Sequence, residues 1–151
     1  MNCYYEFPHT QSVAKPWQSV DCSLYIAEEK PSDFEERIIN KIAQEENVHF
    51  WHRNPEGRKN TLTLNGFLYH QPDFVVVLRS GDVILLETKG EPYLNEESRR
   101  KMTLGALWEK YANMNGGGKF HYYMVFEEEH DEEEKALSVA EIIDLIRQFK
   151  Q

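Results

Sequence analysis

Two carboxylates and a lysine lie at the open ends of the most apolar segment of the chain. Asp73 precedes a run rich in valine, and Glu87 and Lys89 close a second apolar run, with thirteen residues between Asp73 and Glu87. The segment 72–88 therefore predicts a β-hairpin whose strands are covered on both faces. Because side chains two residues apart in a strand share a face, Glu87 and Lys89 are expected to point the same way.

The turn of this hairpin determines whether Asp73 reaches Glu87. A two-residue loop at 80–81 would place Asp73 opposite the residue after Glu87, on the other face of the sheet. A three-residue loop at 79–81 would place Asp73 directly opposite Glu87. Loops of that length need a positive φ at the third residue, which Gly81 adopts without steric cost. The sequence therefore predicts the register that brings the two carboxylates together.

This register would create a site for a cation. Carboxylates on β-carbons about 5 Å apart repel each other and do not both ionise readily. A divalent cation removes the conflict, and oxygen ligands with water completing the shell suit Mg²⁺, or Mn²⁺ in its place. Lys89 cannot ligate a metal, but it can hold an attacking water or hydroxide, or stabilise charge that builds on a phosphate. Together these groups indicate hydrolysis of a phosphodiester bond.

The elements that would position these residues include both helices and strands. Ser32 is a predicted helix N-cap, and Glu35 has capping-box spacing from it. The expected elements are a helix over 33–46, a β-prone segment over 48–52, a short strand within 61–69, the hairpin over 72–88, a helix over 95–113, a strand over 120–126 and a helix over 137–149. Without the short segment within 61–69, the order is α-β-β-β-α-β-α, which predicts an α/β fold in which helices flank a sheet.

Length and composition limit the class of protein. The 151 residues fit a single domain over 31–151, preceded by an irregular N-terminal strap over 1–30 that packs its aromatics on the domain. An aromatic content of 13% argues against a disordered chain, and no apolar run approaches the ~20 residues of a membrane helix. No secretory signal is recognisable and two cysteines are too few for a disulfide framework, so a cytoplasmic location is expected.

The net charge of −9 is concentrated near the C-terminus, where residues 127–151 carry 9 acids and 3 bases. Global acidity argues against tight, non-specific binding of nucleic acid, although it leaves room for a local site. We interpret the acidic run 127–134 as a solvated loop. The alternative is a segment that mimics DNA and competes for the basic residues.

Two basic clusters are the candidate contacts to nucleic acid. The first comprises Arg53, Arg58 and Lys59, and the second comprises Arg99, Arg100 and Lys101. The second cluster falls in the first turns of the helix over 95–113, where a helix N-terminus favours a phosphate. The alternative for this cluster is a plain solvated helix face. The histidines share no metal-ligand spacing, and His70, close to Asp73, is the one expected to contact a substrate.

The residues Pro72-Asp73, followed after thirteen residues by Glu87-Thr88-Lys89, resemble the signature of the PD-(D/E)XK nuclease superfamily. Flanking residues are similar to those of the C-terminal endonuclease domain of type III restriction enzymes, namely Phe34-Glu35, Trp51–Asn54, Tyr69–Phe74, Lys89–Glu91 and Ser98–Lys101. This resemblance covers roughly 32–127. It implies a restriction-endonuclease-like fold, with a central mixed sheet flanked by helices.

The resemblance also implies roles for individual residues. Asp73 and Glu87 would bind the metal, and Lys89 would assist the nucleophile. Glu35 would complete the metal shell, the alternative being that it only caps its own helix. The expected activity is Mg²⁺-dependent hydrolysis of DNA by an endonuclease of a restriction or phage-defence system.

A second hypothesis is an inactive nuclease-like module that binds nucleic acid or docks onto a helicase or restriction partner. The sequence contains no GxxxxGK[ST] loop of a nucleotide-driven motor, so a helicase or modification subunit is an expected partner. Cutting both strands commonly needs two sites, and the resemblance therefore also allows a homodimer.

Overall fold

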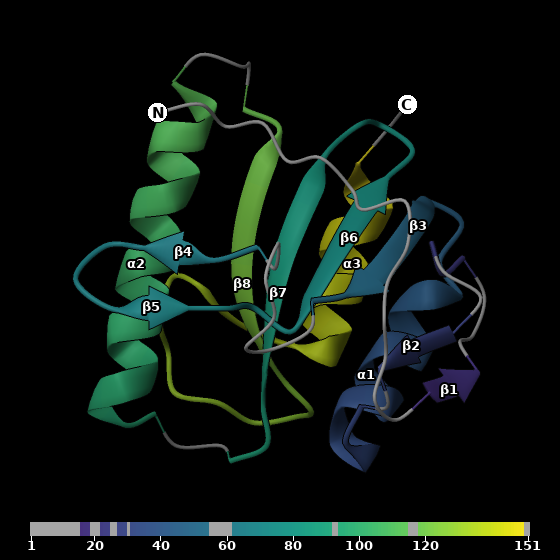
Figure 1. Cartoon of the computed structure of the whole chain (residues 1–151), viewed down its shortest axis with the longest axis horizontal. Coiled ribbons are helices and arrows are strands. Elements are labelled where there is room, and N and C mark those ends of the chain that lie inside the picture. Colours follow the sequence, from purple (N-terminus) through teal and green to yellow (C-terminus); the bar gives the residue numbers. More distant parts are fainter. Residues whose placement is uncertain are drawn as a thin grey trace.

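The computed structural model centres on a five-stranded mixed sheet with the strand order β3-β6-β7-β8-β9 (Figure 1). It describes residues 16–18, 22–24, 27–29, 31–54, 62–91, 94–114 and 118–149. The strands of this sheet are β3 (Val48–Arg53), β6 (Phe74–Leu78), β7 (Val83–Lys89), β8 (Phe120–Phe126) and β9 (Ala136–Ser138). Strand β6 is antiparallel to both β3 and β7, whereas β8 runs parallel to both β7 and β9.

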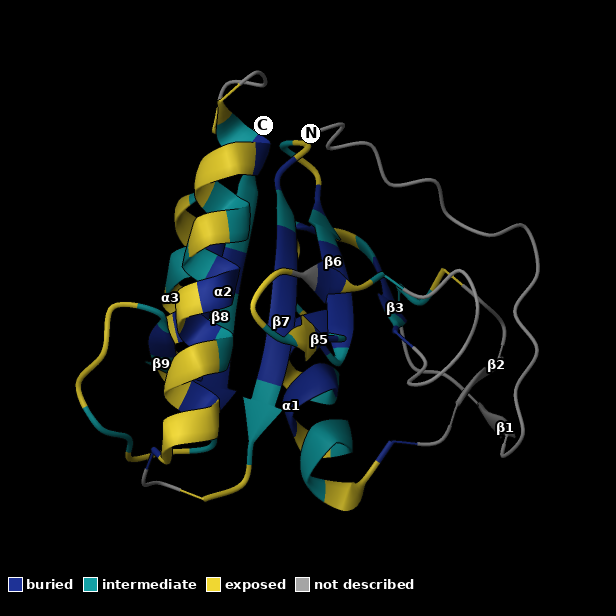
Figure 2. Ribbon diagram, turned by 60° about the vertical axis from the view of Figure 1, so that its left-hand side comes forward, coloured by how far each residue is buried: buried dark blue, intermediate teal, exposed yellow. Residues whose placement is uncertain are grey.

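Helices cover both faces of the sheet. The helices are α1 (Asp33–Ala43), α2 (Glu96–Asn113) and α3 (Val139–Gln148). Isoleucines of α1 and α3 pack with one face of β6 and β7, and α2 packs with the opposite face. Figure 2 shows that β7 is buried along most of its length and becomes half-buried at its C-terminal end. The general prediction of an α/β fold with a flanked sheet is confirmed.

Two small ribbons lie outside the main sheet. One pairs β1 (Pro16–Gln18) with β2 (Ala27–Glu29), within the segment predicted to be an irregular strap. The other pairs β4 (Leu64–Asn65) with β5 (Tyr69–His70) and contacts α2. No helix in the described ranges combines the length and apolar character needed to cross a bilayer.

The hairpin register is the predicted one. Phe74 pairs with Leu86 and Val77 with Val83, so the residue before β6, Asp73, faces Glu87. The loop contains three residues, and Gly81 adopts φ 92° at its third position. Figure 2 shows β6 and β7 side by side, and the two strands are antiparallel. The rule that links turn length to strand register therefore works for this hairpin.

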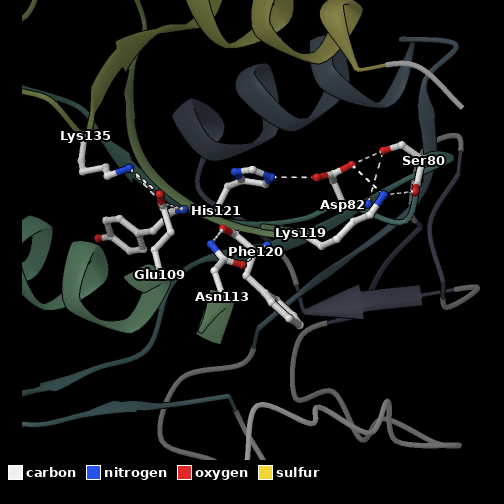
Figure 3. Close-up of polar contacts among 9 residues, drawn as sticks. Ser80, Asp82, Glu109, Asn113, Lys119, Phe120, His121 and Lys135 are labelled. Atoms are coloured by element: carbon white, nitrogen blue, oxygen red, sulfur yellow. Dashed lines mark hydrogen bonds and ion pairs between the residues drawn. The ribbon is translucent and has the colours of Figure 1, made fainter. Parts of the chain in front are cut away.

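Polar side chains hold this turn against β8 (Figure 3). The Ser80 hydroxyl donates to Asp82, and His121 Nε2 lies 2.9 Å from Asp82 Oδ1. Lys119 Nζ donates to the Ser80 carbonyl at 2.9 Å. Partial burial raises the pKa of Asp82, but the hydrogen bonds with His121 and Ser80 outweigh it and lower that pKa overall. Asp82 is thus an ionised anchor that stabilises the turn and its register.

Side chains of α2 fix this helix along β8 (Figure 3). Asn113 Nδ2 donates to the Phe120 carbonyl, and the Phe120 amide donates back to Asn113 Oδ1. Glu109 accepts a hydrogen bond from the Tyr122 backbone amide at 2.9 Å and forms an ion pair with Lys135. These contacts set the position of α2 relative to the sheet, and with it the position of every residue that α2 contributes to the site.

The helix starts agree with the predicted caps. The Ser32 hydroxyl accepts the Glu35 amide at the start of α1, and the Asn95 side chain accepts the Ser98 amide at the start of α2. Strand β8 spans the predicted 120–126.

Three predicted boundaries were wrong. Helix α1 ends at Ala43 rather than at 46. The strand expected within 61–69 is a hairpin, because the chain reverses over 66–68 between β4 and β5. The closing helix begins at Val139 rather than 137, because Ser138 and Glu141 form a capping box and Ala136–Ser138 pairs with β8 as an edge strand.

Gly105 allows α2 to lie close to the sheet. A β-carbon at this position would fall 2.3 Å from the Tyr122 ring, which is fully buried. Gly105→Ala should therefore lower the free energy of unfolding by about 1–3 kcal/mol, despite the higher helix propensity of alanine. Urea unfolding measures the change. Thr103→Ala, at an exposed position of the same helix, is the control and should stay within about 0.5 kcal/mol of the wild type. Equal stability of both variants would contradict this packing.

Candidate active site

Asp73 and Glu87 are in contact at one end of the β6–β7 hairpin. The pKa of each carboxyl depends on a hydrogen bond to the other, which acts to raise the pKa of Glu87 and to lower that of Asp73. Asp73 Oδ2 also accepts the Thr88 amide at 2.8 Å and the Thr88 hydroxyl at 2.6 Å. The Glu87 side chain is only 9% exposed. The hairpin therefore holds two acids in a shared, largely desolvated position.

This environment makes the pair retain a proton. Burial, the negative charge of Asp73 and the hydrogen bond to it together raise the pKa of Glu87 well above its ordinary value. Burial also raises the pKa of Asp73, against the opposing effect of its hydrogen bonds. Two adjacent carboxylates cannot both ionise at low cost in such a setting. A cation that replaces the shared proton would relieve the repulsion.

Asp73 is held in place by Asn54, which the sequence analysis named only within the segment Trp51–Asn54 of the family resemblance. The backbone N–H of Asn54 donates to the backbone carbonyl of Asp73 at 2.8 Å. The side-chain Nδ2 of Asn54 donates to the backbone carbonyl of Pro72 at 2.9 Å. The same side chain exchanges two hydrogen bonds with the Leu62 backbone. Asn54 is buried, so these bonds fix the entry of the chain into β6.

Two lysines lie near Glu87, but they differ in their partners. Lys101 Nζ, from α2, lies 3.2 Å from Glu87 Oε2. Partial burial lowers the pKa of Lys101, but the charge of Glu87 and the hydrogen bond to it outweigh that effect and raise it. Lys89 follows Glu87 by two residues on β7, and its Nζ lies 3.8 Å from Glu91. The structure thus brings to the acid pair a lysine predicted only as a nucleic-acid contact.

His70 and Tyr122 complete the buried side of the site. His70 Nδ1 lies 3.7 Å from Glu87 Oε2, and His70 Nε2 lies 2.7 Å from the Tyr122 hydroxyl. Burial, assisted by the charge of Lys101, lowers the pKa of His70 to about 3. His70 is therefore neutral at physiological pH and adds no charge beside the acids. Proximity to Asp73 in sequence signalled His70, whereas nothing in the sequence singled out Tyr122.

Glu35 and Arg53 form an ion pair beside the site. Arg53 Nη2 lies 3.1 Å from Glu35 Oε2, and both side chains are mostly buried. Ser32 caps the Glu35 amide, while the Glu35 carboxylate reaches Arg53. The charge of Glu35 contributes to the raised pKa of Asp73. Within the described ranges, no group of three or more His, Cys, Asp or Glu side chains is arranged to hold a metal.

The other predicted nucleic-acid contacts do not form one patch. Arg99 lies near Glu133 and Asp131, at 3.4 Å and 3.9 Å. The Arg100 guanidinium lies over the Phe67 ring, 5.8 Å from its centroid. Because successive residues of a helix point in different directions, the side chains of Arg99 and Arg100 lie apart from that of Lys101. Arg58 and Lys59 lie outside the described residues.

The acidic run 127–134 makes specific contacts across the end of the sheet. Glu127 pairs with Arg37 of α1, and Asp131 accepts the Leu94 amide at 3.0 Å before α2. With Glu133 near Arg99, this run neutralises basic side chains of both α1 and α2. Its description as a solvated loop is therefore incomplete.

Two open clefts flank the acid pair. The larger has a volume of about 630 Å³ and is lined by Thr63, Tyr69, His70, Gln71, Glu87, Glu97 and Lys101. The second, of about 360 Å³, includes Glu87 and Lys101 again together with Lys89. Both volumes fall within the range of ligand sites. Because the two clefts share Glu87 and Lys101, an extended ligand that occupied both would pass over these two side chains.

No protein-family model, curated protein or solved structure matches this chain. The geometry of the acid pair and its surroundings therefore carries the functional argument.

The shared proton makes stability depend on pH. The folded pKa values of the pair are raised, so the folded state binds a proton that the unfolded chain has released above about pH 4.3. The stability of the wild type should fall as pH rises through the raised pKa, by at most about 1.4 kcal/mol per pH unit. Glu87→Gln cannot ionise and should lose this dependence.

Urea unfolding in EDTA between pH 5 and pH 8 measures both proteins. The free energy of unfolding of Glu87→Gln, relative to that of the wild type, should increase as pH rises. Glu96→Gln, at an exposed acid of α2, should parallel the wild type. Parallel curves for Glu87→Gln and the wild type would show that the pair holds no extra proton.

Proposed function

We propose that this protein is a Mg²⁺-dependent endonuclease that hydrolyses DNA phosphodiester bonds, in a restriction or phage-defence system. The observation that carries the proposal is the hairpin register that sets Asp73 opposite Glu87, with Lys101 Nζ 3.2 Å from Glu87 Oε2 and Lys89 lining the same cleft as Glu87. Surface charges that only stabilise a fold are usually paired acid to base. Two acids in direct contact are more typical of catalytic sites, where such contacts bind cations and shift pKa values.

The arrangement of elements supports membership of the PD-(D/E)XK superfamily. The elements α1, β3, β6, β7, α2 and β8 follow one another in the predicted order, with the small β4–β5 ribbon inserted, and they form a mixed sheet with helices on both faces. The acid pair and Lys89 lie at one end of the central strands, where the superfamily signature would require them. The edge strand β9 is an addition to the predicted order.

The donor set fits Mg²⁺ or Mn²⁺. Two carboxylates offer hard oxygen ligands, and Mg²⁺ commonly binds through one or two carboxylates with water in the remaining positions. Asp73 and Glu87 would hold the ion after losing their shared proton. Glu35 could join them only if it left Arg53. A bound Mg²⁺ would supply positive charge to the phosphate oxygens and to the leaving oxygen.

The side chains of the chain itself then have distinct tasks. Lys89, on the same face of β7 as Glu87, orients the attacking water in the smaller cleft. Lys101 neutralises Glu87 in the free protein and supplies a positive charge to the phosphate in the complex. Neutral His70, hydrogen-bonded to Tyr122, keeps the Glu87 carboxyl facing the cleft without competing for its charge.

A second candidate function is a nuclease-like module that binds nucleic acid or docks onto a helicase or restriction partner without cutting. The internal ion pairs favour it, because Lys101 and Arg53 already balance Glu87 and Glu35 in the absence of a metal. A protein with this balance is stable without ever binding a cation. Metal binding therefore separates the two functions.

The first test measures metal binding and cleavage together. Mg²⁺ or Mn²⁺ should raise the melting temperature of the wild type and support nicking of a supercoiled plasmid. Asp73→Asn should lose both effects, because one ligand is gone. Glu96→Gln should retain both. Plasmid nicking that is equal in the wild type and Asp73→Asn would remove this site as its source, and absence of a metal shift in the wild type would favour the module.

The second test separates the two lysines. Lys89→Ala should lower the cleavage rate by about 10²–10⁴-fold while the metal-induced shift in melting temperature persists, because Lys89 acts on the nucleophile. Lys101→Met should bind Mn²⁺ more tightly, since it lacks the cation that competes for Glu87, and should raise KM for DNA. Calorimetric titration with Mn²⁺ and steady-state kinetics measure the two effects. Unchanged Mn²⁺ affinity in Lys101→Met would contradict the competition.

A further inference from the structure

The β4–β5 ribbon presents an aromatic ring to solvent beside the candidate active site. Tyr69 is 77% exposed, the highest value among the large hydrophobic side chains of the described residues, and Phe67 in the turn is 50% exposed. Burial of aromatic surface stabilises a folded protein, and an exposed ring forgoes this contribution to folding. An exposed ring at the edge of a polar cleft is available to a ligand.

The ribbon packs against the domain, which determines the side on which Tyr69 lies. Leu64 and His70 are paired across the ribbon and are both buried against the domain. Gly66 in the turn lies so close to Leu104 of α2 that a β-carbon there would be 2.8 Å from the Leu104 side chain. Because neighbouring side chains in a strand alternate, the burial of His70 directs Tyr69 away from the core.

Tyr69 and Glu87, one member of the acid pair, share one cleft. Tyr69, Glu87 and Lys101 all line the cavity of about 630 Å³. A phosphate bound near Glu87 and Lys101 would therefore place its attached nucleoside close to the Tyr69 ring. At the turn, Arg100 stacks on Phe67 and adds a positive charge for a neighbouring phosphate.

We propose that Tyr69 stacks on an unpaired nucleobase, so that the candidate active site takes single-stranded or locally unpaired nucleic acid. This inference rests on the proposed function and adds the substrate class to it. In a duplex, each base is covered on both faces by its neighbours, whereas an unstacked base can lie on an aromatic side chain. The cleft offers one exposed aromatic ring beside Glu87 and Lys101, which matches one nucleobase and its adjoining phosphate.

The test compares strands with and without bases. The probes are a fluorescent oligothymidylate, the same length of strand with abasic sites throughout, and a duplex, all measured by anisotropy at low salt in EDTA so that no cleavage occurs. The wild type should prefer the oligothymidylate to both other probes. Tyr69→Ala should weaken binding of the oligothymidylate by about 5- to 100-fold and leave the abasic strand within twofold.

Two further variants control for the ring and for general surface effects. Tyr69→Phe keeps the ring and should stay within twofold of the wild type. Tyr111→Ala removes a half-exposed aromatic of α2 that does not line the cleft, and should also stay within twofold. Equal losses for the base-bearing and abasic strands in Tyr69→Ala would overturn the stacking, as would no loss at all, a preference for duplex or undetectable binding by the wild type.

The outcome is separable from that of the proposed function. Nicking that depends on metal and Asp73, combined with an unchanged oligothymidylate affinity in Tyr69→Ala, would remove only the stacking. Loss of metal-dependent nicking in the wild type would remove the endonuclease itself, whereas base-dependent binding through Tyr69 would still identify the ribbon as a single-strand contact.

Discussion

The contact between Asp73 and Glu87 is the interaction on which the rest of the site depends. Two like-charged groups are brought together by the register of a hairpin, and that register follows from a three-residue turn with positive φ at Gly81. A shift of one residue would move Asp73 to the other face and separate the acids. The anchor at Asp82, at the far end of the same hairpin, therefore helps to hold the register that brings the two acids together.

The fold accommodates this repulsive contact through compensating neighbours. Thr88 gives Asp73 two hydrogen bonds, and Lys101 gives Glu87 an ammonium group at 3.2 Å. Burial of a charge is tolerable when such partners are present and costly when they are not. The remaining repulsion is removed by a proton, held because the pKa of Glu87 is raised. The fold thus tolerates the contact between the two acids because hydrogen bonds, an ammonium group and a proton offset their repulsion.

Charges elsewhere on the domain are balanced locally. Arg53 pairs with Glu35, Arg99 with the acidic run 127–134, and Lys101 with Glu87. Such pairing leaves no broad basic surface in the described part of the chain, in keeping with the net charge of −9. Contact with a polyanion would then depend on the clefts at Glu87, which Lys101 and Tyr69 also line, more than on long-range attraction.

The sequence by itself determined the hairpin register, the helix starts at Ser32 and Asn95, and the shared face of Glu87 and Lys89, because these depend on turn length, capping and strand alternation. Only the tertiary structure determined which other residues meet the acids. Lys101, His70 and Tyr122 come from a helix, a ribbon and a strand far apart in the chain, and their meeting depends on how closely α2 packs at Gly105. The side of α2 that faces the sheet likewise separates Lys101 from Arg99 and Arg100. Local rules fix neighbours along a strand or helix, whereas packing between elements fixes the neighbours across them.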